Sequence, residues 1–180
     1  LVYYFSEAFK GLGGEVVSED FPEGNANFVS YINNAKSADA GVIFAPVSTN
    51  YAQLIIEAAS AQGFEGHLLG SDTWDNNMVI ESAKGKSVNV EITTFYQEGG
   101  APEFDSGIKA WMNENSDALT NNGGNDMVSA VTAMGYDAYF VALEAIKAAG
   151  STDPAAVLAA LPGVSYSGVS GLIEFDEIGD

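Results

Sequence analysis

The chain contains no cysteine, and it has one histidine in 180 residues. The missing cysteines exclude disulfides, thiolate metal sites and cysteine nucleophiles. His67 has no second imidazole or thiolate with which to share a metal ion, so we expect it to have a structural or surface role. Ser-His-Asp chemistry would also need His67, and the sequence has no Gly-x-Ser-x-Gly elbow. We therefore expect no enzymatic activity, no cofactor and no bound metal.

Long hydrophobic runs are also missing. No stretch approaches the roughly 18 apolar residues that a membrane-spanning helix needs. No charged segment followed by an apolar one marks a signal peptide. The chain begins instead within an amphipathic pattern, in which Leu1, Phe5, Ala8 and Leu12 share one helix face. Because no capping residue precedes this helix, we expect the natural sequence to begin further upstream.

Basic residues are few: 6 stand against 25 acidic ones, for a formal charge of -19. A surface of this charge repels phosphate backbones and anionic lipid, which excludes nucleic acid as a partner. Hydrophobic residues nevertheless make up 47% and charged residues 17% of the chain, so it is a folded domain rather than an acidic disordered segment. The length allows one globular unit and part of a second.

The region from Gly41 to Trp74 alternates between strand and helix patterns. Gly41–Ala45 is an unbroken apolar run, typical of a parallel strand that is covered on both faces. An amphipathic helix is predicted from about Tyr51 to Gln62, and His67–Gly70 is predicted to be the next strand. The region therefore predicts a βαβ unit.

Local signals mark the ends of two helices. Asn50 and Gln53 stand three positions apart, which predicts a capping box at the start of the first helix. Gly63 supplies the left-handed residue that ends this helix. Further along, Asp153 before Pro154 is typical of an N-cap followed by an N1 proline.

The remaining segments continue the alternation of elements. Further strands are predicted at 15–19 and 88–95, and helices at about 26–38, 75–83, 104–115 and 127–149. Residues 166–175 are predicted to form a turn followed by an extended strand. Residues 176–180 are predicted to form a solvated turn, because they lack the ligand spacing of an EF-hand. We predict a three-layer α/β fold with a mainly parallel sheet and helices on both faces. The sheet is expected to include Val16-Val17, Val42–Ala45 and His67–Leu69.

Two loops follow the strands of the βαβ unit and form the candidate site. Val47 and Ser48 follow the first strand, and Ser71-Asp72-Thr73-Trp74 follows the second. Open α/β sheets bind ligands at the carboxyl ends of their strands. The Asp72 carboxylate is suited to an ammonium group, with the indole of Trp74 closing off water. The residues alone leave open the alternative that Asp72 caps a short helix beginning near Trp74 or Asp75.

The order of several short motifs resembles a known family. In sequence they are Phe9-x-x-x-Gly13-Gly14-Glu15-Val16-Val17, then Phe28, Ala40-Gly41-Val42-Ile43-Phe44, Gly63-Phe64, Leu69-Gly70-Ser71-Asp72, Gly135-Tyr136-Asp137-Ala138 with Ala149-Gly150, and Gly168-x-x-Gly171-x-Ile173-x-Phe175-Asp176-x-x-Gly179-Asp180. Together they resemble the branched-chain amino-acid type of periplasmic binding protein, the type I solute-binding component of ABC transporters. The resemblance covers essentially the whole chain.

This resemblance implies a hinged protein with two lobes that close on a small ligand. Residues 1–95 would form the second lobe, residues 96–150 would be helices of the first lobe, and residues 151–180 would return towards the second. The first-lobe sheet and its Ser/Thr-rich ligand loop would precede residue 1, which makes the two-lobe architecture incomplete. At the position of Asp72 the family carries an acidic residue that holds the ligand's amino group. At Val47 and Ser48 it often has an aromatic lid, which is missing here.

The function that the resemblance implies is non-enzymatic. The protein would bind a branched-chain or similar amino acid outside the cytoplasm, as a periplasmic protein or a cell-surface lipoprotein, and deliver it to an ABC permease in the membrane. The alternative is a ligand-sensing domain of a receptor or regulator with the same fold. The expected ligand contacts are Asp72, Ser71, Thr73, Trp74, Val47 and Ser48.

A truncated first lobe would leave apolar side chains of its helices without partners. The residues concerned are Trp111, Met112, Tyr139, Phe140 and Leu143. Because a large apolar patch rarely stays exposed, we expect these side chains to repack or to mediate self-association.

Overall fold

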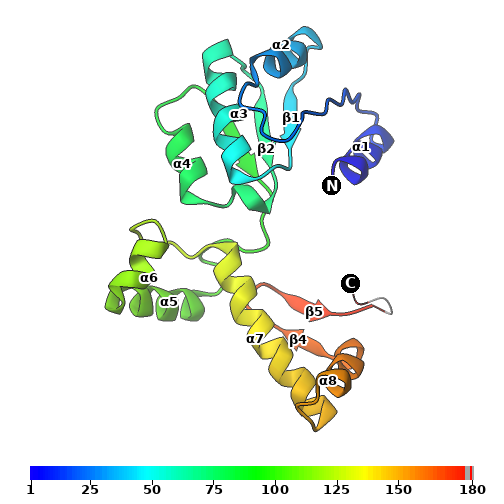
Figure 1. The fold of residues 1–180 in the computed structure, drawn as a ribbon, viewed down its shortest axis with the longest axis vertical. Coiled ribbons are helices and arrows are strands. Elements are labelled where there is room, and N and C mark those ends of the chain that lie inside the picture. The colour runs from blue at the N-terminus through cyan, green and yellow to red at the C-terminus, as the bar shows by residue number, and fades with distance from the viewer. Residues whose placement is uncertain (177–178, 180) are drawn as a thin grey trace. The chain divides into compact units, whose positions relative to one another are not determined.

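The computed structural model of the chain describes residues 1–176 and 179 (Figure 1). It divides into two compact units, Leu1–Thr94 and Phe95–Asp180. The turn predicted at 176–180 lies partly outside the described residues. The assignment of chain segments to lobes stays a prediction.

A parallel sheet of three strands forms the centre of the first unit. Its strands are β1 (Val42–Ala45), β2 (His67–Gly70) and β3 (Asn89–Ile92), in the order β1-β2-β3. Both strand pairs are parallel, and β2 lies in the middle. The predicted βαβ unit is therefore confirmed, and the strand predicted at 88–95 is formed over its central residues.

Helices cover both faces of this sheet. On one face, α3 (Thr49–Gln62) packs against α2 (Val29–Ser37) and α4 (Asn77–Ala83), and their apolar residues bury Ala45 and Leu68. Alternate strand residues point to opposite faces, so Phe44 faces the other way. There Phe5 of α1 (Val2–Gly11) stacks on Phe44 with ring centres 4.2 Å apart, and Figure 1 shows α1 beside β1.

Two predictions for the first unit are wrong. Residues 14–22 form neither helix nor strand, so Val16 and Val17 are not part of the sheet. The two valines are adjacent, so only one could face a core, and their neighbours are polar. The capping box of Asn50 and Gln53 is also absent, because α3 begins earlier, at Thr49, with Ser48 as its N-cap. Gly63 does end α3 in the left-handed conformation, with φ 61°.

In its described residues, the second unit contains four α-helices, a short 3₁₀ helix (Leu161–Gly163) and a hairpin. The helices are α5 (Pro102–Glu114), α6 (Ser116–Asn121), α7 (Ala130–Ala149) and α8 (Pro154–Ala160), and the antiparallel hairpin is β4 (Ser165–Ser167) with β5 (Leu172–Glu174). The Asp153 side chain accepts a hydrogen bond from the Ala156 N–H, which confirms the predicted cap. Helix α6 was not predicted. The residues predicted as a turn, Tyr166 and Ser167, belong to strand β4.

A buried carboxylate joins α7 to the hairpin. Asp137 is 1% exposed and accepts hydrogen bonds from the Val169 N–H (2.9 Å), the Ser170 N–H (2.8 Å) and the Ser170 hydroxyl (2.6 Å). The backbone of Gly168 passes so close that a Cβ there would overlap the Asp137 carboxylate. Glycine is therefore required at this position for the loop to reach the helix.

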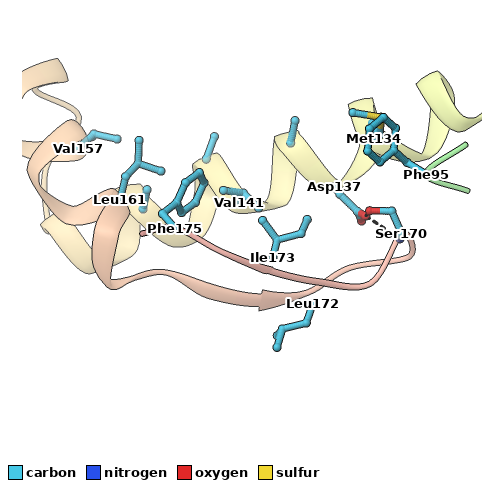
Figure 2. A pocket seen from close by; sticks show the side chains of 13 residues that line it. Phe95, Met134, Asp137, Val141, Val157, Leu161, Ser170, Leu172, Ile173 and Phe175 are labelled. Atoms are coloured by element: carbon cyan, nitrogen blue, oxygen red, sulfur yellow. Dashed lines mark hydrogen bonds between the residues drawn. The ribbon is translucent and has the colours of Figure 1, made fainter. Parts of the chain in front are cut away.

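An apolar groove of about 570 Å³ lies along α7 within the second unit (Figure 2). Its walls come from α7, α8 and the hairpin, and they include Val141, Leu161, Ile173 and Phe175. Elsewhere on the unit, Trp111 and Tyr139 are exposed, whereas Met112 is buried against the core. The predicted self-association stays a prediction.

Replacing Gly70 tests the packing of the first unit. A Cβ at this position would overlap the buried ring of Trp74. We expect Gly70→Ala to lower the free energy of unfolding of this unit by about 1–3 kcal/mol, the usual cost of overpacking. Urea titration followed through the amide signal of Leu68 measures the change.

The matched control is Gly107→Ala in α5, where the new methyl group would contact nothing. A helix interior favours alanine over glycine, so this variant should be up to about 1 kcal/mol more stable. If Gly70→Ala behaved like the control, the described contact between Gly70 and Trp74 would be wrong.

The ion pair of Glu98 predicts a pH dependence for the second unit. Hydrogen bonds from Lys109 and from the Val128 N–H lower the pKa of Glu98 below its ordinary value of 4.5. Because this pKa is lower in the folded than in the unfolded chain, the ionised Glu98 stabilises the folded state at pH values above the pKa of the unfolded chain. The stabilisation is lost as the pH falls through the pKa of the folded state. In urea titrations, Glu98→Gln should therefore be less stable than the wild type at about pH 7 and should approach it near about pH 3. A difference independent of pH would contradict this.

Candidate functional site

The candidate site lies where β1 and β2 end. Val47 and Ser48 lie between β1 and α3, and Ser71 lies between β2 and the short 3₁₀ helix η1 (Asp72–Trp74). The two loops are neighbours because β1 and β2 pair in parallel, with Ala45 opposite Gly70. This edge of the sheet is the one at which α/β folds gather ligand-binding groups.

Hydrogen bonds join the two loops directly. The Val47 carbonyl oxygen accepts two of them, from the Thr73 hydroxyl at 2.8 Å and from the Trp74 indole N–H at 3.1 Å. In return, the Thr49 hydroxyl donates to the Thr73 carbonyl oxygen at 3.0 Å. Thr49 was not among the predicted site residues, although the run of hydroxyl and amide residues at 48–50 is a sequence signal for it.

Ser71 and Trp74 support the loops from inside the unit. Both side chains are buried, Ser71 at 4% and Trp74 at 1% exposure. Because the Thr73 hydroxyl uses its proton for Val47, the Ser71 hydroxyl donates to Thr73, at 3.0 Å between oxygens. In the structure, the indole of Trp74 lies in the core of the first unit, and its contact with a ligand stays a prediction.

Two polar side chains of these loops keep their hydrogen-bonding capacity. Within residues 1–176 and 179, no protein hydrogen bond engages the half-buried Asp72 carboxylate or the Ser48 hydroxyl. The alternative in which Asp72 caps the next helix is wrong: the side chain of Asn76 caps α4 by accepting from the Met78 N–H at 2.8 Å. Asp72 therefore lies in a segment that hydrogen bonds hold in place, and within the described residues its own carboxylate accepts no hydrogen bond from the protein.

This arrangement is suited to binding a cation. A carboxylate and a hydroxyl at the ends of adjacent strands can accept hydrogen bonds from an ammonium group. His67 lies at the other end of β2 and pairs with Glu91 at 2.7 Å. Across the described part of the chain, no group of three or more His, Asp or Glu side chains could hold a metal ion, and no helix is long and apolar enough to span a membrane.

Comparisons with known proteins give one family. A family profile described as "Periplasmic binding protein" matches residues 3–178. Among solved structures, a leucine-binding protein from Thermotoga maritima is 28% identical, with a TM-score of 0.82, over 100% of this chain and 50% of that one. No curated protein matches the chain.

More distant structures share the fold. A branched-chain amino acid transporter substrate-binding protein from Streptococcus pneumoniae, in complex with isoleucine, is 20% identical with a TM-score of 0.76, over 98% of this chain and 48% of that one. A solute-binding protein from R. palustris in complex with benzoate is 18% identical with a TM-score of 0.74, over 98% and 47%. The chain thus spans about half the length of these structures.

Replacing Thr73 tests the connection between the loops. Thr73→Val removes the hydroxyl that donates to Val47 and leaves the buried Ser71 hydroxyl without its acceptor. We expect the first unit to lose about 1–2 kcal/mol of stability in urea titrations. Thr120→Val is the control, because that hydroxyl only bonds within an exposed helix. An equal effect of both substitutions would contradict the role of Thr73.

Proposed function

Because the chain belongs to the periplasmic binding protein family, we propose that residues 1–180 form the part of an extracytoplasmic solute-binding protein that holds the amino group of an amino acid. The family and the parallel α/β fold are shown by the match over residues 3–178. The similar solved structures are solute-binding proteins of transporters, which supports a non-enzymatic role.

The uncommitted carboxylate of Asp72 is the observation that carries this proposal. A partly buried charge without a partner costs free energy, which a bound cation would recover. In our proposal, Asp72 accepts hydrogen bonds from the ligand's ammonium group and Ser48 adds its hydroxyl. Val47, Ser71, Thr73 and Trp74 complete the site by fixing the two loops, as their mutual hydrogen bonds support.

An amino acid suits this site better than an aromatic acid. The distant relatives include proteins in complex with isoleucine and with benzoate, so the fold accommodates both ligand classes. Benzoate carries a carboxylate and no ammonium group, and the Asp72 carboxylate would repel it. The identity of 28% to a leucine-binding protein favours a branched-chain or similar side chain.

The similar solved structures that are transporter binding proteins support a transport role. We propose that the protein delivers its ligand to an ABC permease, either free in the periplasm or as a cell-surface lipoprotein. The second candidate is a sensor domain of a receptor or regulator, which uses the same fold without a permease. The genes beside the coding sequence distinguish these two roles, because a permease gene would favour transport.

Replacing Asp72 tests the binding role. Asp72→Asn keeps the shape of the side chain and removes its charge, so L-leucine should bind about ten- to a hundredfold more weakly. Calorimetric titration of the full-length protein measures this change, and thermal melting should show little loss of stability. Unchanged affinity for L-leucine would refute the assignment of Asp72.

Two controls make the result specific. Asp117→Asn removes the same charge from an exposed position in the second unit, and it should leave affinity unchanged. Titration with benzoate tests the ligand class. If benzoate bound more tightly to Asp72→Asn than to the wild type and L-leucine did not bind to either, the ligand would be an aromatic acid.

A further inference from the structure

A single asparagine of this chain stands directly before a glycine. The pair is Asn122-Gly123, in the loop that joins α6 to α7. An asparagine side chain loses ammonia spontaneously when the next backbone nitrogen attacks it, and a following glycine favours this attack because it has no side chain to block it. Gly123 is exposed to water and has a left-handed φ of 78°. The sequence therefore supports this chemistry best at Asn122.

Hydrogen bonds hold the side-chain amide of Asn122 within the loop. The side chain is half-buried, and its Nδ2 donates to the Asn125 carbonyl oxygen at 2.8 Å and to the Met127 carbonyl oxygen at 2.9 Å. The Gly123 N–H donates to the Thr120 carbonyl oxygen at 3.1 Å. Both reacting groups are thus engaged in the closed loop, so the attack requires the loop to open.

The second of these contacts holds one side of a buried peptide group. While its carbonyl oxygen, on Met127, accepts from Asn122, its N–H, on Val128, donates to the Glu98 carboxylate at 2.9 Å. Val128 is 3% exposed and belongs to the core of the second unit, and Glu98 also binds Lys109 of α5. The Asn122 amide therefore helps to position the chain just before α7 begins.

We propose that Asn122 is a site of spontaneous deamidation, which loosens the second unit. The Gly123 nitrogen bonds to Cγ of Asn122, the Cγ–Nδ2 bond breaks, and the proton of the Gly123 N–H leaves with Nδ2 as ammonia. Water then opens the five-membered ring at either of its two carbonyl carbons, which gives aspartate or isoaspartate. In total, water is consumed, ammonia is released, and the amide becomes a carboxylate.

The product cannot make the contacts of the amide. A carboxylate at position 122 donates no hydrogen bond, and it would be repelled by the carbonyl oxygens of Asn125 and Met127. Isoaspartate also adds a methylene group to the backbone of the loop. The peptide group between Met127 and Val128 then loses one of its two supports. This chemistry does not involve the ligand, so its test is independent of the role of Asp72.

Peptide mapping by mass spectrometry tests the site. The 180-residue chain is incubated in warm, mildly alkaline buffer, and the peptide that contains Asn121 and Asn122 is followed over time. We expect aspartate and isoaspartate to accumulate at Asn122. Asn121 is exposed but is not followed by glycine, so it is the internal control and should stay intact. An unmodified Asn122, or equal conversion of the two residues, would overturn the proposal.

A variant of the same loop tests whether opening limits the reaction. The Asn125 side chain accepts from the Met127 N–H at 3.0 Å, and Asn125→Ala removes this hydrogen bond. The loop should therefore open more often, and Asn122 should react about two- to tenfold faster. An unchanged rate would contradict the requirement for opening.

Hydrogen exchange tests the loosening of the second unit. Asn122→Asp reproduces the aspartate product, and in this variant the Val128 amide should exchange about five- to thirtyfold faster than in the wild type, as expected for the loss of one hydrogen bond. Asn121→Asp adds the same charge at the neighbouring position and should leave the rate unchanged. Unchanged amide shifts in α8 and the hairpin verify that each variant folds. Equal Val128 rates in the two variants would refute the loosening.

Discussion

The carbonyl oxygen of Val47 is the constraint on which the candidate site depends. It accepts hydrogen bonds from the Thr73 hydroxyl and the Trp74 indole, so the loop after β1 is fixed to the loop after β2. Each bond contributes only about 1 kcal/mol to stability, but leaving the groups unpaired inside the unit would cost more. The position of Asp72 follows from this connection, because its two following neighbours are both held.

The second unit uses the same principle, with a carboxylate as the acceptor in place of a carbonyl oxygen. There a buried carboxylate, Asp137, collects two backbone N–H groups and one hydroxyl from the loop of the hairpin. Hydrogen bonds to a charged acceptor are about twice as strong as neutral ones. In both units, a single acceptor group fixes a loop whose backbone forms no regular ladder of hydrogen bonds with a neighbouring strand. The difference is that Asp137 is satisfied by protein groups, whereas Asp72 is not.

The sequence predicted the parallel sheet well because β1, Val42–Ala45, is an unbroken apolar run and a clear helix signal, Gly63, separates it from β2. It failed where a local pattern was weak: Val16 and Val17 lack the alternation that a strand needs, and Tyr166 was assigned to a turn. The candidate loops were located correctly relative to the strands. Sequence alone could not show that Trp74 is buried. The indole of Trp74 fits into the core because Gly70 has no side chain and lets the ring lie against its backbone. The spacing of residues along the sequence does not reveal this contact.

The two tryptophans differ in environment, with consequences for fluorescence. Trp74 in the first unit is 1% exposed, whereas Trp111 in the second is 56% exposed. The emission of a buried indole lies at shorter wavelength than that of a hydrated one, and small polar quenchers reach it slowly. Each unit of this protein therefore carries its own optical reporter: quenching by iodide or acrylamide acts first on Trp111, and the emission that remains reports the region beneath the candidate site.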